Sequence, residues 1–174
     1  MSNVDTRKGA SVVWFTGLSG SGKTTLAHAV ARALEARGRP AELLDGDALR
    51  AVMPSGFSRE ERDAHVRRVG FFASRFEHHG VIAVAALISP YRASRAYARS
   101  LCKKFVEVHV STPLGVCEGR DVKGLYARAR AGLVKGFTGI DDPYEPPEAP
   151  ELSLDTSRCT IEEGTSAVLA LLDR

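Results

Sequence analysis

A glycine-rich run at residues 17–24, with the sequence GLSGSGKT, constrains the fold of this chain more than any other feature. It matches G-x-x-x-x-G-K-[ST], a pattern whose glycines let backbone N–H groups close around phosphate oxygens. Residues 12–16, just before it, are apolar, β-branched or aromatic, as in a buried strand. Residues 25–34, just after it, are rich in helix formers, with apolar residues at i, i+4 and i+8. A strand, a glycine loop and a helix in this order predict a phosphate-binding site at the helix N-terminus.

The lysine and the threonine that end this run predict a nucleoside triphosphate with a metal ion. Lys23 can reach the β- and γ-phosphates, and the Thr24 hydroxyl is expected to hold Mg²⁺. ATP is favoured over GTP, because guanine-specific enzymes usually carry N-K-x-D and the only asparagine in the chain is Asn3. We therefore expect ATP and Mg²⁺ as cofactors. The predicted ATP-binding residues of the loop are Gly17, Leu18, Ser19, Gly20, Ser21, Gly22, Lys23, Thr24 and Thr25.

Composition and charge argue against several classes of partner. A net charge of +3 is too weak to indicate nucleic-acid binding, although it suits a site that gathers phosphates. The longest apolar run, residues 81–88, is too short to span a bilayer, and residues 1–8 lack the apolar stretch of a secretory signal. Three widely spaced cysteines without a C-x-x-C pair are typical of reduced thiols. We expect a cytoplasmic protein whose partner is a small molecule, not nucleic acid or a membrane.

Alternating strand-like and helix-like segments predict an α/β fold of the P-loop nucleoside triphosphate hydrolase type. Its three layers would be a parallel β-sheet of about five strands with helices on both faces, and its ligands would bind at the carboxyl ends of the strands. Residues 1–10 are expected to form a flexible tail, and residues 11–174 a single domain. Strands are predicted at 12–16, 40–44, 81–87, 105–110 and 152–154, and helices at 25–37, 48–53, 58–79, 90–102, after 113 and at 161–172.

Residues 119–150 break the alternation and read as a long loop rich in basic side chains, glycine and proline. A loop of this length inside a compact domain is usually functional or disordered. We predict a basic lid that closes over the phosphates and excludes water, with a solvated basic loop as the alternative. Its basic residues up to 135 are Arg120, Lys123, Arg128, Arg130 and Lys135.

Phosphoryl transfer also needs a carboxylate that positions or deprotonates the acceptor. The predicted third strand ends without an acidic residue, whereas Asp45 and Asp47 follow the second strand. We predict Asp47 as the base or acceptor-orienting group, with Asp45 as structural support. The alternative for Asp47 is a plain helix cap.

Several further motifs occur in a fixed order along the chain: LDGD at 44–47, FSREER at 57–62, ISPYR at 88–92, KGLY at 123–126 and GFTGIDDPY at 136–144. With the glycine-rich loop, they resemble the adenylylsulfate kinase family from about residue 9 to the end of the chain. That family transfers the γ-phosphate of ATP to the 3′-hydroxyl of adenosine 5′-phosphosulfate (APS), giving PAPS and ADP in sulfate activation. The resemblance implies the same activity, APS as the small-molecule substrate, and a homodimer.

The resemblance also implies roles for single residues. Arg50 and Arg62 match arginines on the phosphosulfate, where a planar bidentate donor suits the anion. Phe57 and Phe137 match aromatic residues that hold the acceptor adenine. The implied substrate-binding residues are Asp47, Arg50, Phe57, Arg62, His65, Ile88, Ser89, Lys123 and Phe137, and Arg120 matches a residue near the adenine of ATP. The implied catalytic residues are Lys23, Asp47 and Ser89, the last matching a serine described in some members as a phosphorylated intermediate, although direct in-line transfer needs no covalent step.

Two residues depart from the family pattern. His65 replaces an asparagine that contacts the acceptor, and histidine differs from it in size and charge. We expect an altered acceptor affinity, or one that depends on pH near neutrality. Val122 replaces a proline and is expected to loosen the lid without removing Lys123. A kinase for another nucleotide or small-metabolite hydroxyl and a non-catalytic nucleotide-binding module remain alternatives.

Overall fold

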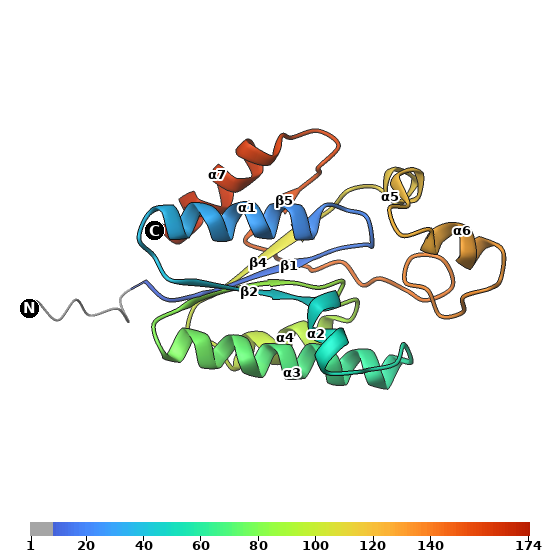
Figure 1. The fold of residues 1–174 in the computed structure, drawn as a ribbon, viewed down its shortest axis with the longest axis horizontal. Helices are drawn as coiled ribbons and strands as arrows, with labels where there is room; N and C mark the ends of the chain where they lie inside the picture. Colours follow the sequence, from blue (N-terminus) through green and yellow to red (C-terminus); the bar gives the residue numbers. More distant parts are fainter. Residues whose placement is uncertain (1–8) are drawn as a thin grey trace, which may run out of the picture.

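A parallel sheet of five strands, in the order β2-β3-β1-β4-β5, forms the centre of this computed structural model, which describes residues 9–174 (Figure 1). All neighbouring strands are parallel, as the sequence predicted. Most of the expected flexible tail at residues 1–10 lies outside the described residues. The strands are β1 (Val12–Thr16), β2 (Ala41–Asp45), β3 (Ile82–Ala86), β4 (Phe105–Val110) and β5 (Leu152–Leu154).

Helices cover both faces of the sheet (Figure 1). On one face lie α1 (Lys23–Ala36) and α7 (Ile161–Leu172), and on the other α3 (Arg59–His78) and α4 (Arg92–Ser100). A short helix, α2 (Gly46–Val52), follows β2 directly. Among residues 9–174, no helix has the length and apolar character needed to cross a membrane. The three-layer α/β architecture is therefore confirmed.

The sheet separates two apolar cores, because successive side chains of a strand point to opposite faces. In β1, Val13 and Phe15 pack with side chains of α1 and α7, whereas Val12 and Trp14 pack with side chains of α3 and α4. All four side chains are completely buried. This burial on both faces explains why the sequence of β1 is a continuous apolar run.

The segment predicted as a long loop, residues 119–150, contains more regular structure than the sequence suggested. It begins inside α5 (Leu114–Arg120) and includes α6 (Leu125–Arg130). The carboxylate of Asp121 accepts hydrogen bonds from the N–H groups of Tyr126 and Ala127, both at 3.0 Å. These two hydrogen bonds pair backbone N–H groups of the first turn of α6 that have no partner within the helix. A six-residue helix therefore forms in a stretch where glycines and charged residues had predicted a loop.

Candidate functional site

The glycine-rich loop joins β1 to α1 at the carboxyl edge of the sheet. Gly17, Gly20 and Gly22 all have positive φ angles, of 148°, 73° and 98°. A Cβ atom on Gly17 would lie 2.4 Å from the carbonyl oxygen of Val110, so only glycine fits there. The loop therefore turns tightly around the space above the N-terminus of α1, where phosphate binding is expected.

Lys23 lies across this loop and is almost completely buried. Its Nζ atom donates hydrogen bonds to the Leu18 carbonyl oxygen at 2.6 Å and to Ser21 Oγ at 3.4 Å. Burial lowers the pKa of Lys23 to about 8, although the nearby carboxylates of Asp45 and Asp47 oppose the shift. The ammonium group is thus held beside the loop at neutral pH, within reach of phosphates that bind there.

Thr24 and Asp45 lie side by side where α1 begins and β2 ends. The Thr24 hydroxyl donates to Asp45 Oδ2 at 3.0 Å. Asp45 Oδ1 accepts from the N–H groups of Asp47 and Ala48, at 2.9 and 3.0 Å, so Asp45 is the N-cap of α2. The cap role that the sequence left open for Asp47 therefore belongs to Asp45. Asp45 also places a carboxylate oxygen 3.0 Å from the Thr24 hydroxyl, the expected magnesium ligand, and the sequence had not assigned a role in metal binding to Asp45.

Asp47 lies in the first turn of α2 and forms an ion pair with Lys123 of the lid. The two residues are 76 positions apart, and both side chains are largely exposed. An exposed pair of this kind contributes little to stability and opens readily. The fold thus brings the predicted base and the predicted lid lysine together at the edge of the sheet where ligands bind.

Arg50 and Phe57 flank the same edge. Nη1 of Arg50 donates to the carbonyl oxygens of Ser55 and Gly56, at 2.8 and 2.9 Å. Its guanidinium lies over the Phe57 ring, 4.9 Å from the centroid, and 67% of Phe57 is exposed. An exposed aromatic ring at the rim of a site suits stacking with a base.

Phe137 is placed differently from the sequence expectation. It is buried in an apolar cluster of the lid with Cys117 and Tyr126, and its ring meets the Tyr126 ring edge-on at 5.0 Å. Tyr126 in turn donates to the Ser19 carbonyl oxygen at 2.9 Å, which connects this cluster to the glycine-rich loop. In this conformation Phe137 packs inside the lid and supports it, while the ring of Phe57 is exposed at the rim of the site.

Arg62, on α3, is buried by the lid segment. Its Nη1 donates to Thr138 Oγ1 at 2.5 Å and to Asp142 Oδ2 at 2.8 Å, and its Nη2 donates to the Gly136 carbonyl oxygen. The expected anion-binding arginine thus also holds the lid segment against α3.

His65, one turn further along α3, is 2% exposed, and neither ring nitrogen has a hydrogen-bond partner within residues 9–174. Burial, together with the charges of Arg50 and Arg68, lowers the pKa of His65 to about 4, although the Gly46 backbone opposes the shift. The imidazole is therefore neutral near pH 7. This lowered pKa argues against the pH sensitivity near neutrality that the sequence suggested.

Ile88 and Ser89 follow β3 at the same edge. Ser89 has a φ of 41°, which is rare for a residue with a side chain, and is 2% exposed. Its Oγ accepts a hydrogen bond from Trp14 Nε1 at 3.1 Å, and its carbonyl oxygen accepts one from Arg95 Nη1 at 2.6 Å. The Ile88 carbonyl accepts from Thr16 Oγ1 at 2.8 Å. Because the Ser89 hydroxyl is bonded to a core tryptophan, the geometry favours a positioning role over the expected catalytic one.

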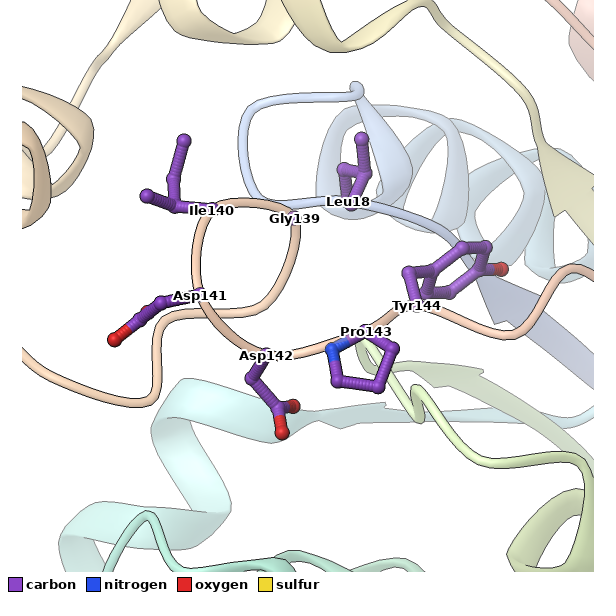
Figure 2. A pocket seen from close by; sticks show the side chains of 7 residues that line it. All are labelled: Leu18, Gly139, Ile140, Asp141, Asp142, Pro143 and Tyr144. Atoms are coloured by element: carbon purple, nitrogen blue, oxygen red, sulfur yellow. The ribbon is translucent and has the colours of Figure 1, made fainter.

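Two cavities border the glycine-rich loop. One, of about 520 Å³, lies between Leu18 and the lid segment 139–144 (Figure 2). The other, of about 190 Å³, lies beside Arg120, which donates to the Gly20 carbonyl oxygen at 3.1 Å and to Thr156 Oγ1 at 2.9 Å. The second cavity is lined by Gly22, Thr25, Leu26, Arg120, Thr156, Cys159, Thr160 and Ile161.

The second cavity shows what sequence reasoning missed. Residues 156–161 follow β5 and were not assigned to the site, although Arg120 and Thr25 were. The signal was available, because the segment after any strand of a parallel sheet reaches the ligand-binding edge. Its place beside the phosphate loop suits the nucleoside part of ATP.

Comparisons with known proteins identify the family. A sequence profile described as adenylylsulphate kinase matches residues 9–155. An adenylyl-sulfate kinase of Synechococcus sp. (strain JA-3-3Ab) is 54% identical over 168 residues, which cover 95% of each chain. The Mycobacterium tuberculosis APS kinase CysC in complex with AMPPNP and APS has a TM-score of 0.90 and 42% identity, over 95% of this chain and 98% of that one. The hexameric APS kinase from Thiobacillus denitrificans has a TM-score of 0.72 and 38% identity, over 94% of this chain and 29% of that one. With a profile match over most of its length and a relative of this identity, the chain belongs to the adenylylsulfate kinase family.

Proposed function

We propose that this member of the family transfers the γ-phosphate of ATP directly to the 3′-hydroxyl of APS, giving PAPS and ADP, with the residues assigned below. The observation that carries the assignment is the meeting of three groups at one edge of the sheet. These are the ammonium of Lys23 beside the glycine-rich loop, the hydroxyl of Thr24 against Asp45, and the Asp47–Lys123 pair. Together they supply cations for the transferred group and a carboxylate for the acceptor, which phosphoryl transfer needs.

ATP would lie with its phosphates in the loop and its adenine in the cavity beside Arg120 and Thr156. The donor set near Thr24 fits Mg²⁺, because this ion takes one or two protein oxygens and completes its shell with phosphates and water. Thr24 and Asp45 would hold it, directly or through water, and the ion supplies charge neutralisation on the β- and γ-phosphates. Lys23 would bind the γ-phosphate from the other side.

APS would lie between α2, α3 and the lid. Asp47 would accept the proton of the 3′-hydroxyl, and Lys123 would leave its ion pair to neutralise the transferring phosphate. Arg50 and Arg62 would bind the phosphosulfate, and Phe57 would stack on the adenine. Ser89 would hold the strand end in place without forming a covalent intermediate, since its hydroxyl is bonded to Trp14.

We also place this chain in the cytoplasm as a homodimer. Phe71 and Phe72 on α3 support an interface, because both rings are exposed, by 53% and 40%, and lie edge to face with centroids 5.9 Å apart. Light scattering on the wild type and on Phe71→Ser/Phe72→Ser would test it. We expect twice the monomer mass for the wild type and the monomer mass for the variant, whereas a wild-type monomer would contradict the proposal.

The reaction is tested by ADP release with MgATP and APS, beside samples with adenosine monophosphate, PAPS or no acceptor. Of these acceptors, we expect only APS to give turnover. In Asp47→Ala the rate of ADP release should fall by about 10²-fold or more, since a positioned base contributes that much. ADP release with another acceptor would favour the related-kinase alternative. No turnover with any acceptor would favour the non-catalytic alternative.

A further inference from the structure

Asp142 lies on the lid segment 136–144 and contacts the elements on the opposite wall of the acceptor site. Its Oδ2 accepts from Arg62 Nη1 at 2.8 Å, and its two carboxylate oxygens lie 3.3 and 3.1 Å from the Tyr91 hydroxyl, which donates. Arg62 is in α3, and Tyr91 is the residue before α4. One carboxylate therefore joins the lid to both helices, across 80 and 51 positions of the chain.

Within residues 9–174, the side chain of the neighbouring Asp141 makes only local hydrogen bonds. Its carboxylate accepts from the N–H groups of Gly136 and Phe137, at 2.7 and 2.5 Å, within the same loop. Figure 2 shows the two carboxylates leaving the loop in different directions. The chain thus offers two adjacent aspartates of equal charge, of which only Asp142 is bonded to Arg62.

The hydrogen bonds of Arg62 leave part of its guanidinium available to a ligand. Thr138 and Asp142 take both hydrogens of Nη1, and the Gly136 carbonyl takes one of Nη2. Within residues 9–174 no acceptor is found for the Nε hydrogen or for the second hydrogen of Nη2. An arginine held on one side can present its remaining donors to an anion in a fixed direction, and less ordering is then needed on binding.

We propose that Asp142 is a positioning residue for the acceptor: it orients Arg62 so that the remaining donors face the anionic group of APS. This inference rests on the proposed function, which supplies the anion. Thr138 and the Gly136 carbonyl alone leave the guanidinium without a charged partner in a site where its side chain is only 9% exposed. Without a carboxylate partner, a buried guanidinium is unstable in place and turns towards solvent or another acceptor, so its donors no longer point in a fixed direction.

The charge of Asp142 makes the proposal testable, because its two possible effects on APS affinity have opposite signs: its negative charge repels the anion, whereas its orientation of Arg62 favours binding. Asp142→Asn removes a negative charge close to Arg62, and on charge alone APS should bind more tightly. If Asp142 acts by orienting Arg62, APS should bind more weakly. Asp141→Asn makes the same change of charge one position away, at a carboxylate that accepts from the Gly136 and Phe137 N–H groups and not from Arg62.

The experiment compares kcat and the KM values for APS and ATP in the wild type, Asp142→Asn, Asp141→Asn and Tyr91→Phe. For Asp142→Asn we expect the KM for APS to rise about 10-fold, because the charge-assisted hydrogen bond to Arg62 becomes a weaker neutral one, while the KM for ATP stays within about twofold. Tyr91→Phe removes the second bond to Asp142 without changing charge, and we expect the same selective rise at about threefold. Asp141→Asn should change the KM for APS by less than about twofold.

An unchanged or lower KM for APS in Asp142→Asn would overturn the inference, as would an equal rise in Asp141→Asn. If Asp142→Asn does not fold, the Tyr91→Phe result decides in the same way. Calorimetric titration with APS separates this inference from the proposed function. If the wild type binds APS without turnover, the proposed reaction is wrong, and the Asp142 inference is then tested by comparing the APS affinities of the same variants. If the wild type does not bind APS, both the proposed function and this inference are wrong.

Discussion

The hydroxyl of Thr24 donates a 3.0 Å hydrogen bond to Asp45, which joins the first turn of α1 to the end of β2. The same carboxylate caps α2 through its other oxygen. Asp45 therefore sets the direction of the Thr24 hydroxyl and the place of Asp47 at once. A single side chain links the phosphate end of the site to the acceptor end.

Replacing Asp45 should consequently affect stability and catalysis together. We expect Asp45→Ala to lower the free energy of unfolding by about 1 kcal/mol through the lost cap. We also expect kcat to fall by about 10-fold or more, because Thr24 and Asp47 both lose their support. Asp45→Asn is the matched control, since its amide oxygen can keep the cap. Urea unfolding and kcat measurements at saturating Mg²⁺ check this, and full activity in Asp45→Ala would show that Asp45 does not support the site.

Lys123 should matter for the reaction and hardly at all for stability. Its ion pair with Asp47 is exposed on both sides, so Lys123→Met should change the free energy of unfolding by less than about 1 kcal/mol. We expect kcat to fall by about 10-fold or more if Lys123 neutralises charge in the transition state. Lys135→Met, an exposed lid lysine, provides the control and should leave kcat nearly unchanged. Equal effects of the two substitutions would mean that the lid acts only through its overall charge.

The pKa of Lys23 predicts how ATP utilisation depends on pH. Burial lowers this pKa to about 8, so the fraction of protonated Lys23 in the free protein falls as the pH rises above that value. Since kcat/KM reports groups of the free enzyme, kcat/KM for ATP should fall about tenfold per pH unit above pH 8. The profile is measured between pH 6.5 and 9.5 with APS held well below its KM, so that the enzyme without bound APS predominates. A flat profile up to pH 9.5 would show that the pKa of Lys23 is not lowered, because an ammonium with the ordinary pKa of 10.5 stays protonated over this range.

Protonation of His65 should weaken the folded state in acid. The folded protein holds the pKa of this imidazole at about 4, below its ordinary value of 6.5, so the unfolded chain binds the proton more strongly. The contribution of neutral His65 is therefore complete above pH 6.5 and is lost as the pH falls from 6.5 to 4. A shift of this size corresponds to about 3 kcal/mol.

His65→Asn isolates this contribution, because other acid-sensitive groups are the same in both proteins. We expect the free energy of unfolding of the variant to fall less steeply between pH 6.5 and 4 than that of the wild type. Urea unfolding at several pH values measures the difference. Parallel curves would show that His65 titrates alike in the folded and unfolded chains.

Several parts of the fold were predictable because their signals are local. The run of β1, the glycines of the loop and the start of α1 are contiguous, and each follows from backbone sterics and burial. The start of α3 is another such case, since Ser58 and Glu61 form the capping box that their spacing predicts. α6 was missed because its N-cap is Gly124, and the carboxylate that accepts from its first N–H groups belongs to Asp121, three positions earlier.

The sequence by itself determined the phosphate loop, the α/β class and, through resemblance, the kind of acceptor. The tertiary structure alone decided which groups meet: Asp45 with Thr24, Lys123 with Asp47, and Asp142 with Arg62. It also turned the Ser89 hydroxyl towards Trp14 and buried Phe137 in the lid. The physical reason is that the three pairs join residues separated by 21 to 80 positions. Their meeting depends on the strand order β2-β3-β1-β4-β5 and on how the lid packs, and neither is encoded in a local pattern.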